Sequence, residues 1–514
     1  MGTKLNIPLP SKGVVVDRPA EYIDARAAVN IKNMEINRGI IRKRAGMIQL
    51  GASLGERVMR YFELQVGGAT RLFRVGLTKI EVLNKTTGVW SSVIAAPLTG
   101  TQADIVNFAF PLLSGSKIVT FTNGIDNIKK CSITGNVSDL GGTPPKARFI
   151  QALGPYLVIG FITAGGNTYY SRVQWCDTGN PEEWDPTGTN AGSQDLLDDP
   201  EDITGLGLMG PYLTVHKPFS IYIGQLDSSS AVFRFDRRAT GSGAIAGATI
   251  CQIPDGRQIF LGSEGLHIFD GNTAPLVNAP IQDEIRERMN PLFAYKSYAI
   301  SVRELDEYWV AIPMDDDEEP NTVYKYNWRS GQMYKDLRTN ITTMGLYQNS
   351  QGEFTIDDLV GTYDDSLLRF DNELSLVLNP NVVLGDTTGV SSNRTDQTHD
   401  DNGVANSSIW DTKDFVGEDY GISDIDMMMR WKGGQIWAKG DSLSIYYSID
   451  SGTTWTIITS MTLSDDYPSD DAPLLFYLDV VSSKIRFRFR NDLSEETFSI
   501  KKYQIEASQR EVRK

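Results

Sequence analysis

Few residues of this 514-residue chain have the types and spacing of catalytic or metal-binding groups. The histidines and cysteines are few and far apart in sequence: His216, His267, His399, Cys131, Cys176 and Cys251. An odd number of cysteines without a CxxC pair indicates buried thiols in a reducing cytoplasm, not a disulfide framework or a zinc site. The HExxH and Walker patterns, and a GxGxxG loop leading into a helix, are missing. We therefore expect no catalytic site, no cofactor, no metal and no enzymatic activity.

Three acidic runs are the next candidates for chemistry, at Asp315–Glu319, Asp198–Asp202 and Asp400–Gly403. A calcium loop places oxygen ligands at alternating positions around a glycine that makes the bend. The run at Asp315 has no glycine and is followed by Pro320. We expect all three runs to be solvated turns.

Two segments have the composition of structural turns closed by a tryptophan. Ser448 to Trp455 matches the Asp-box pattern SxDxGxTW, in which Asp450 binds backbone amides, Gly452 permits the reversal and Trp455 packs back on the hairpin. Asp boxes recur in sialidases as turns remote from the active site. A glycosidase needs two carboxylates facing the sugar, and the sequence establishes no such pair.

The other turn follows a strand pattern from Tyr169 to Trp175. Asp177, Gly179 and Pro181 end that strand, since glycine tolerates a positive φ and proline fixes φ. Trp184 is expected to fold back as an aromatic plug.

The elements that position these turns are short strand pairs, repeated about every 40–55 residues from 56 to 375. The pairs begin near residues 71, 117, 156, 212, 258, 307 and 354, and the last joins Phe354–Tyr363 with Leu367–Phe370. Repeats of this length made only of strands predict an all-β fold containing a β-propeller of six or seven small blades. One amphipathic helix, 280–293, interrupts the series with Ile281, Ile285, Met289 and Leu292 on one face.

The regions on either side of the predicted propeller differ from it. Residues 1–55 have few periodic runs and predict an extended arm that lends one strand to a sheet. Residues 376–412 are rich in Asn, Thr, Ser, Asp and Gly and predict a linker or long surface loop. Residues 413–514 return to short strands and predict a C-terminal β-sandwich.

Charge is distributed unevenly along the chain, whose net charge is −16. Residues 1–60 carry 11 Lys or Arg against 5 Asp or Glu, a net charge of about +6, so the remainder carries about −22. An acidic body argues against tight nucleic-acid binding. The densest basic point is Arg42, Lys43 and Arg44, which is either a solvated or internally paired cluster or a contact with a partner subunit. The sequence has no run of about 18 apolar residues, so it predicts no membrane span. The opening residues lack the apolar core of a signal peptide.

Motifs spread over nearly the whole chain resemble the tail-hub or nozzle proteins of short-tailed bacteriophages, the podovirus packaged-DNA stabilisation protein family. They are LPSKGVVVDRPAEYIDARAAVNI, GIIRKRAGM, WCDTGNPEEWDP, ITGLGLMGPYLTVHKPFSIYIG, the helix at 281–292 and SIYYSIDSGTTW. Ala45-Gly46 stands where that family has Pro-Gly, which leaves the shape of this turn open.

This resemblance implies a virion structural protein made in the host cytoplasm. Its partners would be further copies of itself in a homo-hexameric ring, the portal adaptor ring, and tail fibres or a tail needle. DNA would pass through the channel without specific binding, and no membrane insertion is implied. The alternatives are a glycan-binding, tailspike-like propeller and a sialidase-like glycosidase.

Overall fold

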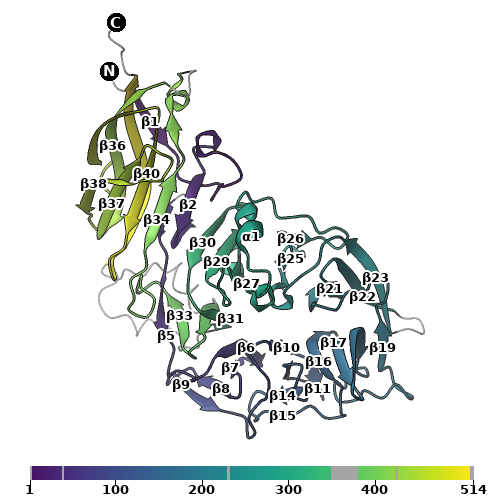
Figure 1. Cartoon of the computed structure of the whole chain (residues 1–514). Coiled ribbons are helices and arrows are strands. Elements are labelled where there is room, and N and C mark those ends of the chain that lie inside the picture. The colour runs from purple at the N-terminus through teal and green to yellow at the C-terminus, as the bar shows by residue number, and fades with distance from the viewer. Residues whose placement is uncertain (1–2, 38–39, 228–231, 349–379, 423–426, 510–514) are drawn as a thin grey trace.

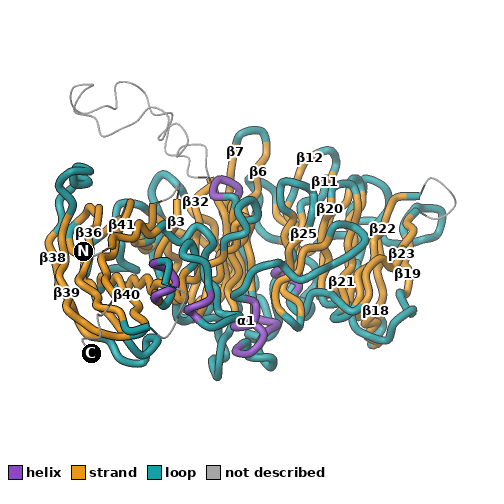
Figure 2. The backbone as a smooth tube through the Cα atoms, turned by 90° about the horizontal axis from the view of Figure 1, so that it is seen from above, coloured by secondary structure: helices purple, strands orange, loops and turns teal. Residues whose placement is uncertain are grey.

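The computed structural model describes residues 3–37, 40–227, 232–348, 380–422 and 427–509 (Figure 1). Strands make up 53% of the structure and helices 5%, so the chain is all-β. Seven small antiparallel sheets follow one another around a common centre, and a C-terminal body of two larger sheets lies beside them. Seen edge-on, the seven sheets and the C-terminal body share one layer (Figure 2).

The first four sheets are each built from one continuous stretch of chain. Sheet one has the order β6-β7-β8-β9 (Val58–Val66, Ala69–Gly76, Ile80–Asn84, Val89–Ser92). Sheet two is β10-β13-β14-β15 (Asn107–Ala109, Val119–Thr122, Lys129–Cys131, Ser138–Asp139), beside the small pair β11-β12 (Leu112–Leu113, Ser116–Lys117). Sheet three is β16-β17-β18-β19 (Lys146–Leu153, Tyr156–Ala164, Asn167–Trp175, Gly192–Asp195). Sheet four is β20-β21-β22-β23 (Gly205–Met209, Tyr212–Lys217, Ser220–Leu226, Phe233–Thr240).

The last three sheets complete the circle, and the seventh takes a strand from the N-terminal segment. Sheet five is β24-β25-β26 (Cys251–Gln252, Gln258–Gly262, Gly265–Phe269). Sheet six is β27-β28-β29-β30 (Tyr298–Val302, Glu307–Ile312, Thr322–Asn327, Met333–Leu337). Sheet seven is β31-β32-β33-β5 (Ile341–Gln348, Pro380–Asp386, Ser391–Thr395, Gly46–Gln49).

Neighbouring sheets pack face to face through shared hydrophobic clusters, and the circle closes because sheet seven packs on sheet one. Small sheets of this size cannot bury an apolar face alone, so each needs its neighbours. Residues of neighbouring sheets that belong to the same cluster are, in order around the circle, Phe62 and Phe121, Ile128 and Ile159, Trp175 and Tyr222, Ile223 and Phe260, Leu261 and Val310, Trp309 and Met344, and Val383 and Tyr61.

The C-terminal body consists of two sheets whose inner side chains meet in one hydrophobic cluster, which includes Trp410, Phe487, Phe489, Ile500 and Tyr503. One sheet is β3-β4-β41-β36-β39 (Met34–Asn37, Ile40–Lys43, Phe498–Gln509, Met429–Gly440, Leu474–Ser482), with β1 (Thr3–Ile7) paired to β41. The other is β34-β40-β37-β38 (Ser408–Thr412, Lys484–Asn491, Ser442–Ser448, Thr456–Thr462), with β35 (Phe415–Val416) paired to β40.

One strand makes this second sheet continuous with sheet six. β2 (Ala28–Lys32) pairs in parallel with β30 and antiparallel with β34. The N-terminal segment therefore contributes strands to both bodies, which goes beyond the single strand predicted for the arm.

The helices are short and lie in connections. They are α1 (Gln282–Arg288) and the 3-10 turns η1 (Ala20–Tyr22), η2 (Gly247–Thr249), η3 (Ala294–Lys296), η4 (Arg303–Leu305) and η6 (Gly417–Tyr420). The helix predicted over 280–293 is too long. Met289 is extended and pairs with Met314, and Leu292 is 76% exposed. Pro291 disfavours the helical conformation at the residue before it, which helps to end the helix early.

The predicted linker 376–412 is wrong for its described part, since β32, β33 and β34 lie between residues 380 and 412. The polar composition of β33 concealed a strand whose serines are buried. Ser391 accepts hydrogen bonds from the hydroxyl of Tyr61 (2.7 Å) and the guanidinium of Arg74 (3.0 Å). In β33, side-chain hydrogen bonds take the place of the apolar contacts from which a strand is normally predicted.

Candidate functional site

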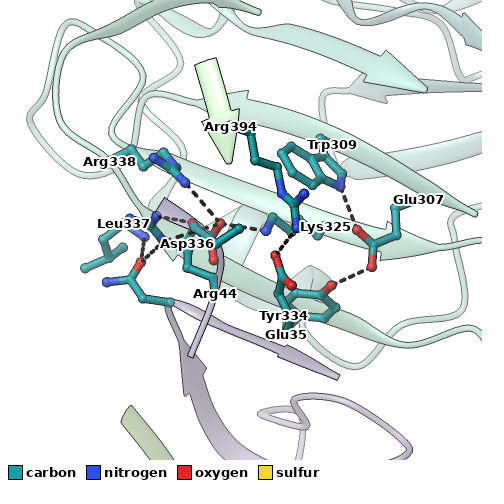
Figure 3. Close-up of polar contacts among 12 residues, drawn as sticks. Glu35, Arg44, Glu307, Trp309, Lys325, Tyr334, Asp336, Leu337, Arg338 and Arg394 are labelled. Atoms are coloured by element: carbon teal, nitrogen blue, oxygen red, sulfur yellow. Dashed lines mark hydrogen bonds and ion pairs between the residues drawn. The ribbon is translucent and has the colours of Figure 1, made fainter. Parts of the chain in front are cut away.

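A set of charged side chains lies close together where the N-terminal segment, sheets six and seven and the C-terminal body meet (Figure 3). We call it the joint cluster, and its members are Glu35, Arg42, Arg44, Lys325, Asp336, Arg338, Arg394 and Asp401. β3 brings Glu35, β4 brings Arg42, and Arg44 directly follows β4. β29 and β30 bring Lys325 and Asp336, and β33 brings Arg394. Segments far apart in sequence are thus held together by ion pairs.

Arg44 is at the centre of the joint cluster and is fully buried. Its guanidinium donates two hydrogen bonds to the carboxylate of Asp401, one of them 2.9 Å long, and lies 3.7 Å from Asp336. Arg338 donates to the same Asp401 carboxylate at 2.9 Å. Burial opposes the charge of Asp401, but Arg338 and Arg44 outweigh it and lower the pKa of this carboxyl.

Asp336 is also fully buried and joins the cluster to sheet six. The ammonium group of Lys325 lies 2.7 Å from its carboxylate and 4.1 Å from the centre of the Trp309 ring. The ion pair and the cation–π contact together compensate the loss of water around the Lys325 charge.

Glu35 closes the cluster on the side of sheet seven. Its carboxylate accepts hydrogen bonds from Arg42 (3.1 Å) and Arg394 (3.0 Å). Burial alone would raise the pKa of Glu35, but Arg394, Lys325 and Arg42 overcome that effect and hold it well below its usual value.

Glu307 lies beside the cluster without a cationic partner within ion-pair distance among the described residues. It accepts hydrogen bonds from the Tyr334 hydroxyl and from the Trp309 indole (2.7 Å). Burial raises the pKa of this carboxyl.

The basic triplet predicted as a partner contact is mostly internal. Lys43 is fully buried and donates to Asn491 and to the carbonyl of Leu493, each at 3.0 Å. Arg44 is buried in the joint cluster, and only Arg42 is partly accessible, with 40% of its side chain exposed. The partner-contact hypothesis is therefore corrected for Lys43 and Arg44. Alternation along β4 turns the Lys43 side chain inward, and Arg44 lies after the end of the strand, where alternation no longer decides its direction.

Two of the acidic runs also contain buried residues, contrary to the prediction of solvated turns. Asp400 is fully buried and accepts a hydrogen bond from Ser494. Asp199 lies 2.7 Å from the buried ammonium group of Lys217 and accepts hydrogen bonds from Ser220 and Tyr222. In the third run, the half-exposed Asp315 pairs with Arg288.

The turn after β18 has the predicted participants. Asp177 accepts a hydrogen bond from the backbone of Asn190 (2.9 Å), and Gly179 has a φ of 71°. Trp184 is 5% exposed and donates its indole N–H to the carbonyl of Pro181 at 2.9 Å. The tryptophan packs in the cluster between sheets two and three.

The Asp-box turn joins β37 to β38. Asp450 accepts hydrogen bonds from the backbone and hydroxyl of Thr454, and Gly452 has a φ of 91°. The guanidinium of Arg488 lies 3.9 Å from the centre of the Trp455 ring. Hydrogen bonds from Ser448 and Thr454 lower the pKa of Asp450, which marks a turn-stabilising carboxylate.

The sequence prediction missed most of the joint cluster because its charges come from separate stretches of chain. The available signal was an Asp or Lys in the middle of a strand pattern, such as Asp336 between Tyr334 and Leu337. Within the residues that the structure describes, no group of three or more His, Cys, Asp or Glu is arranged to hold a metal ion. None of the helices described is long and apolar enough to cross a membrane.

Comparisons with known proteins assign this chain to no family. No model of a protein family matches the sequence, and no curated protein matches it. Among solved structures, it is similar to BBS1N in complex with ARL6DN (10% identity, TM-score 0.39, covering 68% of this chain and 97% of that chain). It is also similar to the extracellular domain of a putative hybrid two-component system from B. thetaiotaomicron (11%, 0.35, 80% and 46%) and to Chaetomium thermophilum Raptor (8%, 0.41, 71% and 29%). Similarities with such low identities and TM-scores give no information about the function of this chain.

Proposed function

We propose that this chain is a structural virion protein, the tail-hub or nozzle subunit of a short-tailed bacteriophage. In this proposal a homo-hexameric ring lies below the portal and its adaptor, extends and closes the DNA channel, and anchors fibres or a needle. The observation that carries the proposal is the connection between the two bodies. β2 makes one sheet continuous across them, and the buried charges of the joint cluster fix the N-terminal segment between them. A subunit that binds neighbouring subunits on several sides needs its two bodies held in a fixed position relative to each other.

The architecture in this proposal is a seven-bladed β-propeller with a C-terminal β-sandwich. The cyclic order of the hydrophobic interfaces supports the propeller, since each small sheet packs on the sheets before and after it and the seventh packs on the first. β5 from the N-terminal segment pairs with β33 and completes the last blade. The last blade therefore joins a strand from the N-terminal segment to strands from much later in the chain.

Charge and motifs support the same proposal. The net charge of −16 disfavours binding of phosphate, so DNA can pass through a channel built from this chain without being held. The motifs from Leu9 to Met47, from Trp175 to Pro186 and from Ser444 to Trp455 resemble the nozzle family. A catalytic role has no comparable support in the described residues.

Native mass spectrometry of the full chain, alone and mixed with a purified portal–adaptor assembly, tests the proposal. We expect a complex of several 57.0 kDa chains on the adaptor, and electron microscopy of that complex to show a ring. A chain that stays monomeric at high concentration and does not bind the adaptor would reject it.

A further inference from the structure

A cavity of about 580 Å³ opens where the innermost strands of sheets two to six begin. Its wall includes Ile105 before β10, Arg148 on β16, Thr204 before β20, Gly247 in η2 and Tyr295 before β27. Pockets of 300–1,000 Å³ that combine apolar walls with a few convergent polar groups are typical ligand sites. Five successive sheets contribute to this one, which no turn motif in the sequence predicts.

The cation of the cavity has no acidic partner. Among the described residues, no carboxylate forms an ion pair with Arg148, and its guanidinium lies over two phenylalanine rings, 6.0 Å from Phe149 and 5.5 Å from Phe161. Arg172, by contrast, pairs with Asp195 on the neighbouring strand β19. The free guanidinium of Arg148 is therefore available to bind an anionic group by a charge-assisted hydrogen bond.

Phe161 is aimed at the cavity by an irregularity in its strand. The pairing of β17 with β18 shifts register between Gly160 and Ile162, and Phe161 has a φ of 56°. A positive φ is strained for a bulky residue. The bulge turns the Phe161 ring towards Arg148, where Tyr170 supports it edge-on with ring centres 5.1 Å apart.

The wall of the cavity also contains polar side chains. Glu201 and Asp202 line the cavity without an ion-pair partner among the described residues, and Tyr295, which has a hydroxyl group, lines it as well. Burial raises the pKa of Tyr295, so this hydroxyl keeps its proton. Two carboxylates beside one unpaired arginine disfavour a polyanion such as a nucleotide, because they would repel it.

We propose that this cavity binds a sugar that carries one carboxylate, a uronic acid residue of an acidic glycan. Arg148 binds the sugar carboxylate, Glu201 and Asp202 accept hydrogen bonds from its hydroxyl groups, and the ring of Phe161 packs on its apolar face. This site goes beyond the proposed role in a tail, and it does not depend on ring formation.

Isothermal titration of the full chain with galacturonate, trigalacturonate and neutral galactose tests the site. We expect galacturonate to bind at least tenfold more tightly than galactose, since the two differ only in the carboxylate that pairs with Arg148. Comparable or tighter binding of trigalacturonate would identify a glycan chain, and binding of the monosaccharide alone would identify a free sugar acid. Absence of binding by both acids, or equal binding of galactose, would overturn the proposal.

Two variants assign the binding to the cavity. Arg148→Gln should weaken galacturonate binding at least tenfold and leave the weak galactose binding unchanged. Arg329→Gln, at a side chain that is 75% exposed on sheet six, is the matched control and should bind like the parent chain. Equal affinities of the two variants would overturn the assignment. Unchanged circular dichroism and melting temperature of Arg148→Gln show that its loss of binding is not a loss of fold.

Discussion

At the scale of single residues, the chain uses its buried charges for structure. Arg44, Lys325 and Asp336 are each no more than 1% exposed and satisfy one another's charge. Transfer of such groups out of water costs several kcal/mol per ion, which their mutual attraction offsets only while all partners are present. The cluster therefore fixes the joint between the two bodies more than it adds to net stability.

Removing one partner of the joint cluster should destabilise the fold strongly. Asp336→Ala leaves the buried ammonium group of Lys325 without its ion-pair partner, and we expect the free energy of unfolding to fall by about 3–5 kcal/mol. Asp479→Ala breaks an exposed pair with Arg430, in which the side chains are 65% and 53% exposed, and should leave the unfolding free energy close to that of the parent chain. Urea unfolding of both variants measures the difference. A loss of similar size in the two would show that the cluster is not needed at the joint.

A buried histidine predicts how stability depends on pH. His216 is fully buried between sheets four and five, and burial lowers its pKa from 6.5 to about 4, although a hydrogen bond with Gln258 opposes this. Between these values the unfolded chain binds the proton and the folded chain does not. Stability is therefore retained above pH 6.5 and lost as the pH falls towards 4, by up to about 3 kcal/mol.

His216→Gln removes this titration and keeps a hydrogen-bonding group next to Gln258. We expect a shallower fall of the unfolding free energy between pH 6.5 and 4 than in the parent chain, measured by urea unfolding at several pH values. Parallel pH profiles for the two proteins would contradict the assignment.

At the scale of elements, hairpins were predictable and polar strands were not. Six of the predicted hairpins pair in the structure, among them β13 with β14, whose turn is held by the side chain of Asn123 on the amides of Ile125 and Asp126. The one predicted over 354–370 lies outside the described residues. Alternation of apolar residues and a turn dipeptide are local signals that single sequences carry.

The elements that failed depend on partners distant in sequence. β33 is polar because Tyr61 and Arg74 of sheet one bind Ser391, and β5 is a strand because β33 lies beside it. The joint cluster was equally out of reach, since Arg44 and Asp401 are 357 residues apart. Local composition does not indicate which distant segments pair with each other. The strand order of sheet seven and the joint cluster could therefore not be predicted from the sequence.

The interface that closes the circle of sheets depends on a close approach at a glycine. A Cβ at Gly345 of β31 would lie 2.5 Å from the Cβ of Tyr61 on β6, which forces sheets seven and one apart. We expect Gly345→Ala to lower the free energy of unfolding by about 1–3 kcal/mol. Gly160→Ala is the matched strand control, because its Cβ would meet only ordinary contacts at 3.5 Å or more, and it should melt close to the parent chain. Equal melting temperatures of the two variants would show that the closing interface can relax.

At the scale of the whole molecule, the buried joint changes which basic residues are available for a partner. Charge reversal at Lys43 or Arg44 would place a carboxylate in a buried site and would report on folding, not on attachment. Lys12, Arg18 and Arg26 are exposed cations of the N-terminal segment, with side chains that are 49%, 55% and 53% exposed. They pair only with the nearby Asp17 and Asp24, in contacts that add little to stability at the surface.

If the N-terminal segment attaches this chain to an acidic adaptor ring, these three cations form the contact. The triple variant Lys12→Glu, Arg18→Glu and Arg26→Glu should keep the parent melting temperature within a few degrees and lose at least tenfold in affinity for the portal–adaptor assembly. Because the contact is electrostatic and exposed, the affinity of the parent chain for the assembly should also fall as salt rises from 50 to 500 mM, since the Debye length becomes shorter over that range. The matched control reverses Arg234, Arg237 and Arg238 on β23, with side chains 62%, 40% and 42% exposed, and should bind the adaptor as the parent does. An equal loss of affinity in both triple variants would show that the effect comes from the change in net charge. Unchanged binding by the first triple variant would place the attachment elsewhere on the chain.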